Sequence, residues 1–141
     1  MVGSSAGAYL AMMLCFDPNF LGAYGLSRED FGGFLFDAGQ PTVHFNVVRE
    51  SGLPTQTVIV DERAPMFHVR ESAQYPPMLF LCAEHDIPGR YEQTLLMLSV
   101  LKQFGHGGKA AFRYMEGYDH CQYDRMPVFS DIILDFIKEH R

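Results

Sequence analysis

The feature that most constrains this chain is a G-x-S-x-G pattern at its start, formed by Gly3-Ser4-Ser5-Ala6-Gly7. The pattern is typical of a sharp turn from a strand into a helix, which lifts the central serine above a sheet. Side chains at positions 3 and 7 are expected to clash across such a turn, so both glycines are needed. Taken alone, five small residues could equally form a flexible terminal turn, so the rest of the chain must decide.

Apolar patterns divide the remaining sequence into alternating strands and helices. Strands are expected at 34–36, 78–82 and 111–115, and helices at 9–16, at 65–69, at 91–104 and from 129 to the end of the chain. Between them, Val43, Phe45, Val47 and Val48 suit a further strand, and residues 58–60 form another short apolar patch. Strands that alternate with helices predict the α/β class, with a parallel sheet and helices on its faces.

Composition limits the partners and the compartment. The 141 residues carry a formal net charge of −6, which provides no positive field for phosphates, so no nucleic-acid partner is expected. No apolar run approaches the roughly 18 residues that span a bilayer, so no membrane partner is expected either. Cys15, Cys82 and Cys121 form no C-x-x-C pair and favour a reducing compartment, which predicts a cytoplasmic location.

Two further residues complete a candidate catalytic group. Asp86 follows the apolar run 78–82 and His120 follows the run 111–115, so both should stand at the carboxyl edge of a parallel sheet. A histidine can remove the proton of Ser5, and a carboxylate can orient that histidine and stabilise its charged form. The order serine, acid, histidine is the one that this fold uses.

Each assignment has a simpler alternative. Asp86 could be a turn residue, and Glu84 is a second candidate for the acid. His120 could be a surface histidine, with the adjacent Asp119 in a functional role instead. Cys121 beside His120 admits a thiol mechanism, although the G-x-S-x-G turn supplies a serine.

Three stretches resemble the hormone-sensitive-lipase-like and acetyl-esterase branch of the α/β-hydrolases. They are GSSAGAYLA, PPMLFLCAEHD followed by YEQ, and YMEGYDH. The resemblance covers nearly the whole chain and implies an α/β-hydrolase fold in which Ser5 is the nucleophile and Asp86 and His120 complete the triad. The N–H of Ala6, directly after the nucleophile, would then be one donor of the oxyanion hole.

In that family a His-Gly-Gly-type loop and four strands precede the nucleophile, and this sequence contains neither. We therefore expect residues 1–141 to form a single C-terminal portion of a catalytic domain, a partial fold with its N-terminal strands missing. The sheet would have one exposed edge, and unprotected edges invite self-association.

The expected activity is that of a serine esterase acting on small acyl esters. An amide or peptide bond is the alternative within the same chemistry, and a catalytically silent truncated fragment is the alternative outside it. No cofactor is expected. A metal site built from His85, Asp86 and His120 would lack the ligand spacings that mark zinc motifs, so no metal is expected either.

Overall fold

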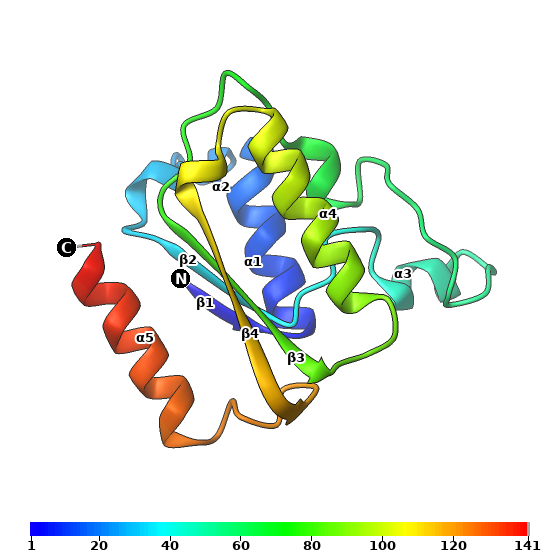
Figure 1. Ribbon diagram of the computed structural model, residues 1–141. Coiled ribbons are helices and arrows are strands. Elements are labelled where there is room, and N and C mark those ends of the chain that lie inside the picture. The colour runs from blue at the N-terminus through cyan, green and yellow to red at the C-terminus, as the bar shows by residue number, and fades with distance from the viewer. Residues whose placement is uncertain (141) are drawn as a thin grey trace.

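The computed structural model describes residues 1–140 and contains one parallel sheet with helices on both faces (Figure 1). The strands are β1 (Val2–Ser4), β2 (Phe34–Asp37), β3 (Met78–His85) and β4 (Ala110–Asp119). The helices are α1 (Ala6–Phe16), α2 (Pro18–Gly22), α3 (Phe45–Glu50), α4 (Arg90–Gln103) and α5 (Pro127–Glu139). Three short 3₁₀ helices lie at Arg28–Asp30, Pro65–His68 and Gly107–Lys109.

The strands lie in the order β1-β2-β3-β4, and every neighbouring pair is parallel. Their carboxyl ends therefore meet at one edge of the sheet, which is the edge where the sequence places the candidate residues. The α/β class, the parallel sheet and the flanking helices are confirmed.

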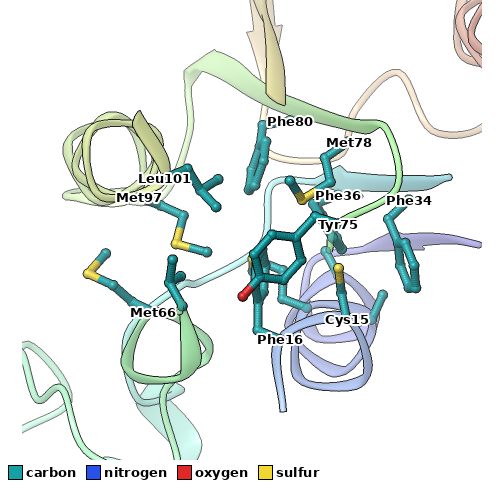
Figure 2. Close-up of a cluster of buried hydrophobic side chains, with 14 residues drawn as sticks. Cys15, Phe16, Phe34, Phe36, Met66, Tyr75, Met78, Phe80, Met97 and Leu101 are labelled. Carbon is teal, nitrogen blue, oxygen red and sulfur yellow. The ribbon is translucent and has the colours of Figure 1, made fainter. Parts of the chain in front are cut away.

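Alternating side chains on β2 and β3 divide the core into two clusters. Phe34 and Phe36 of β2 and Phe80 of β3 point towards α1 and α4, into the cluster drawn in Figure 2. Leu35 and Leu81 point the other way, into a second cluster closed by Phe129, Ile132 and Tyr123 from α5 and the loop before it. Because both faces are covered, both strands are apolar runs without polar alternation.

The termini of the helices follow local signals. Pro18 and Pro127 stand in the first turns of α2 and α5, where the missing N–H costs no hydrogen bond. Gly105, just after α4, has φ of 84°, a conformation that glycine adopts without strain. The helix predicted from 129 onwards is α5, and its last residue, 141, lies outside the described residues.

Two expectations on this part of the chain were wrong. Residues 45–50 form the short helix α3 and not a strand, because the His44 ring nitrogen Nδ1 accepts the N–H of Asn46 and caps a helical turn. The apolar residues of the helix at 91–104 also suggest that Leu95 faces the core, but the buried stripe of α4 is Thr94, Met97 and Leu101, and Leu95 is 40% exposed.

One edge of the sheet is formed by β1, which pairs with β2 alone within residues 1–140. Its Val2 side chain is 45% exposed. The self-association predicted through an exposed edge stays a prediction.

Candidate active site

Ser5 occupies a strained turn between β1 and α1. Its φ of 53° and ψ of −117° lie outside the conformations that a non-glycine residue normally adopts, and α1 begins at the next residue. A Cβ on Gly3 would stand 2.4 Å from the carbonyl oxygen of Gly7, so that glycine is required. The expectation for Gly7 was wrong, because the residue is exposed and a Cβ there would come within 4 Å of no described atom beyond its neighbours and its own helix backbone.

The structure brings the three candidate side chains together from the carboxyl ends of β1, β3 and β4. The Ser5 hydroxyl Oγ lies 2.9 Å from His120 Nε2, and His120 Nδ1 lies 2.6 Å from Asp86 Oδ1. Ser5 and His120 are 115 positions apart in the sequence, so only the fold joins them. The expected proximity is observed, and the catalytic roles stay a prediction at this point.

Asp86 is held as a carboxylate. Its side chain is only 3% exposed, and this burial would raise its pKa, but the hydrogen bond from His120 and those from the backbone N–H groups of Ile87 and Ala83 together lower the pKa. An ionised carboxylate only accepts hydrogen bonds, so His120 Nδ1 carries the proton and Nε2 is left to accept the Ser5 hydroxyl.

The competing residues do not take these places. Glu84 is exposed and accepts the backbone N–H of Gly117 at 2.7 Å. The backbone N–H of Asp119 donates to Gln122 Oε1 at 2.9 Å, in the turn that follows β4. Cys121 Sγ lies 3.6 Å from His120 Nε2, but burial raises the pKa of its thiol to about 12, which leaves it protonated and a poor nucleophile.

The role of the Ala6 N–H as an oxyanion donor stays a prediction, and the fold places this N–H at the start of a helix. Ala6 is the first residue of α1, and the first N–H groups of a helix have no carbonyl partner within it. The residue is exposed, and its N–H follows the nucleophile directly. The helix also places the positive end of its dipole beside Ser5.

Within the described residues, no group of three or more His, Cys, Asp and Glu side chains could hold a metal ion. No helix in residues 1–140 is both long and apolar enough to cross a bilayer. The three cysteines are free thiols, and the cytoplasmic location inferred from them stays a prediction.

The sequence analysis missed a second layer of polar residues beneath this site. The carboxylate of Asp37, at the end of β2, accepts the Tyr123 hydroxyl at 2.5 Å, and both residues are fully buried. Arg90, also buried, donates to the carbonyl oxygen of Ala38 and to Gln40 Oε1. The available signal was an aspartate that ends an apolar strand at the same edge as Asp86.

A cavity of about 440 Å³ opens next to the loop that carries Asp86. Ile87, Pro88 and Gly89, which follow the acid directly, line the cavity together with Phe45. The amides of Gln40 and Gln93 add polar groups to a mainly apolar lining. A cavity of this kind at the carboxyl edge of the sheet suits part of a small organic substrate.

Comparison with solved structures identifies the fold. A thermophilic esterase, Est2, from the Planctomycetes species Thermogutta terrifontis has a TM-score of 0.70 at 17% identity, covering 98% of this chain and 53% of that one. Porphyromonas gingivalis dipeptidyl peptidase 4 has a TM-score of 0.67 at 14% identity, covering 99% of this chain and 19% of that one. Pyrococcus horikoshii acylaminoacyl peptidase has a TM-score of 0.60 at 15% identity, covering 89% of this chain and 20% of that one.

These likenesses confirm part of an α/β-hydrolase fold, and the chain spans about half the length of the esterase. A search among curated proteins finds no significant match. The hormone-sensitive-lipase-like and acetyl-esterase branch is not confirmed, because the family model that matches is a different one. That model describes the prolyl oligopeptidase family, Peptidase_S9, and it matches residues 1–141. Because the family model matches all 141 residues of the sequence, the chain belongs to the prolyl oligopeptidase family.

Proposed function

We propose that the chain carries the catalytic triad of a serine hydrolase, with Ser5 as nucleophile, His120 as general base and Asp86 as its orienting acid, and that it cleaves carboxylic esters of small acyl groups. The observation that carries the proposal is the continuous line of two hydrogen bonds, 2.9 Å and 2.6 Å long, from the Ser5 hydroxyl through His120 to Asp86.

In the first half of the reaction, Ser5 Oγ attacks the ester carbonyl while His120 Nε2 takes the hydroxyl proton. Asp86 stabilises the imidazolium that forms, and the N–H of Ala6 donates to the oxyanion of the tetrahedral intermediate. One such donor typically contributes a factor of about 10²–10³ to the rate. His120 then gives its proton to the departing alcohol, which leaves an acyl group on Ser5.

In the second half, His120 removes a proton from water, and the resulting hydroxide attacks the acyl-serine carbonyl. The tetrahedral intermediate again places its negative oxygen at Ala6 N–H. Its collapse breaks the bond to Ser5 Oγ, which takes the proton from His120, and the carboxylic acid departs. The proton transfers between Ser5 and His120 join two atoms that lie 2.9 Å apart.

An amide or peptide substrate is the second candidate, and a specific observation favours it. The matching family is named for an oligopeptidase, and two of the similar structures are peptidases. The acetyl-esterase resemblance of the three sequence motifs favours the ester. Hydrolysis of p-nitrophenyl acetate compared with aminoacyl p-nitroanilides separates the two, because the ester proposal expects turnover of the acetate and none of the anilides.

Labelling with a fluorophosphonate probe tests the nucleophile itself. We expect the probe to modify Ser5, located by peptide mass spectrometry, and Ser5→Ala to abolish labelling. Ser99→Ala, an exposed serine on α4, is the matched control and should label as the parent chain does. A folded chain that takes up no probe would contradict the proposal and favour a silent truncated fragment.

A further inference from the structure

Backbone strain in the described residues gathers around one buried side-chain pair. Three non-glycine residues of the described part have positive φ, Ser5 at 53°, Ala38 at 50° and Cys121 at 54°. Such conformations cost of order 1–3 kcal/mol each and persist only where the surroundings hold them. All three lie next to the pair that Asp37 and Tyr123 form.

Asp37 reaches the nucleophile through its backbone. Its carbonyl oxygen accepts the Ser5 N–H at 2.8 Å, and Ser4, the residue before the nucleophile, pairs with Asp37 in the sheet register. Ala38, which is also strained, follows directly, and its N–H donates to the Leu81 carbonyl of β3 at 2.9 Å. The end of β2 therefore fixes the turn that presents Ser5.

The same residue reaches the base through its side chain. Asp37 Oδ1 accepts the hydroxyl of Tyr123, three positions after His120, at 2.5 Å. The Tyr123 ring is fully buried, edge-on to Tyr118 with ring centroids 5.3 Å apart, in the cluster beneath α5. Strained Cys121 lies between His120 and this anchor.

We infer that Asp37 and Tyr123 are a positioning pair that holds the Ser5 turn and the His120 loop at hydrogen-bonding distance from each other. Asp37 connects the two loops, by its backbone carbonyl to Ser5 and by its carboxylate to Tyr123. A displacement of about 1 Å between reacting groups can cost a factor of about 10² in rate, so a tie of this kind bears on catalysis without touching substrate. The inference rests on the proposed function.

The surroundings of Asp37 and Tyr123 favour a positioning role for the pair over a role in proton transfer. The second carboxylate oxygen of Asp37, Oδ2, is buried and accepts no hydrogen bond from residues 1–140. Burial raises the pKa of Tyr123, and the bond to Asp37 raises it further, so the phenol keeps its proton and donates. A neutral donor on a buried acceptor gives a directional contact between two loops.

Three variants test the contact between Asp37 and Tyr123, and a fourth serves as the control. Tyr123→Phe removes only the hydroxyl, Asp37→Ala removes the acceptor, and Asp37→Asn keeps an acceptor oxygen in its place. Tyr75→Phe removes another buried phenol hydroxyl, one that accepts the Arg70 N–H at 3.3 Å on the opposite face of the sheet.

The first readout needs no turnover. The proton between His120 Nδ1 and Asp86 lies in a 2.6 Å contact and should resonate far downfield in the proton NMR spectrum. We expect this resonance in the parent chain, in Tyr75→Phe and in Asp37→Asn, and we expect it broadened or lost in Tyr123→Phe and Asp37→Ala. An unchanged resonance in a folded Tyr123→Phe chain would overturn the inference.

The second readout is the rate of fluorophosphonate labelling at Ser5, together with kcat and KM for p-nitrophenyl acetate. Tyr123→Phe should lower the labelling rate and kcat by about 10-fold or more at unchanged KM, while Tyr75→Phe stays within about twofold. Normal labelling of Tyr123→Phe would overturn the inference and leave the proposed function standing. If the parent chain itself takes up no probe, the proposed function is contradicted. The NMR resonance would then still test whether Asp37 and Tyr123 position His120.

Circular dichroism detects a folding defect shared by Tyr123→Phe and Asp37→Ala. If Tyr123→Phe and Asp37→Ala both fail to fold while Tyr75→Phe folds, the pair is a requirement of the fold and the positioning role is overturned. If either variant folds, its resonance and labelling rate decide.

Discussion

The ends of β2 and β3 lie side by side, and each places an aspartate with a buried side chain at the same edge of the sheet, yet the pKa values of the two carboxyls shift in opposite directions. Asp86 accepts hydrogen bonds from His120 and from two backbone N–H groups, which outweigh its burial and lower its pKa. At Asp37 burial prevails over the hydrogen bond from Tyr123 and raises the pKa. The balance between burial and the hydrogen bonds that each carboxyl accepts therefore decides which one is ionised more readily.

This difference suits the two positions to different tasks. Asp86 faces a histidine that becomes positively charged during the proposed reaction, and a reliably ionised carboxylate stabilises that charge. Asp37 faces a phenol that stays neutral, and it connects two loops instead. The comparison predicts that Asp86 matters mainly for rate, whereas Asp37 contributes more to stability.

The largest expected effect is that of Asp86→Asn. The amide would favour the wrong tautomer of His120 and would no longer stabilise its charged form, so kcat for p-nitrophenyl acetate should fall by a factor of about 10⁴. The free energy of unfolding, measured in urea, should change far less than the rate. A variant that retains more than a tenth of the parent kcat would break the comparison.

The next effect is on stability. Asp37→Ala leaves the Tyr123 hydroxyl buried without an acceptor, and an unsatisfied buried donor costs about 1–3 kcal/mol. Urea unfolding followed by circular dichroism should show that loss. Tyr123→Phe in the Asp37→Ala background should recover part of it, since no donor is then left unpaired, and a further loss would contradict this account.

Much of the fold was predictable because its signals are local. The runs at 34–36 and 78–82 have both faces covered, so they are apolar throughout and mark β2 and β3 directly. The loop of Asp86 and the loop of His120 follow strands of one parallel sheet, and the strand order brings their ends to a common edge. The order of the residues along the chain and their positions after strands thus predicted that Ser5, Asp86 and His120 would lie together.

The rest depended on contacts between distant segments. The β-branched Val47 and Val48 favour a strand, but residues 45–50 form a helix whose first turn is capped by the bond from the Asn46 N–H to His44 Nδ1. Asp37 and Tyr123 are 86 positions apart, and neither belongs to a motif. Nothing in the local sequence indicates that a tyrosine after His120 reaches the end of β2.

A pH series sharpens the comparison, because the two pKa shifts have opposite signs. An unfolded aspartate titrates near about pH 3.9. Asp86, with its lowered pKa, contributes stability above that pH and loses it as the pH falls through its folded pKa. Asp37, with its raised pKa, contributes stability below that pH and loses it as the pH rises through its folded pKa.

The stability that each aspartate adds over asparagine should therefore change in opposite directions. From about pH 3 to about pH 7, the parent chain should gain stability relative to Asp86→Asn and lose stability relative to Asp37→Asn. Urea unfolding across this range measures both differences. If both stability differences change with pH in the same direction, the opposite pKa shifts of Asp86 and Asp37 are contradicted.

The smallest effect should come from Glu84→Gln. This variant tests whether a carboxylate at the end of β3 affects kcat by its position alone. Glu84 is exposed, two residues before Asp86, and accepts the Gly117 N–H at 2.7 Å, a bond that the glutamine oxygen can still accept. We expect kcat within about twofold of the parent value and a change in unfolding free energy within about 0.5 kcal/mol, as for Glu92→Gln on the exposed face of α4. Glu84 and Asp86 lie at the same strand end, but they accept hydrogen bonds from different donors. A loss of kcat in Glu84→Gln close to that in Asp86→Asn would mean that the negative charge at this edge of the sheet, and not the contact with His120, governs the reaction.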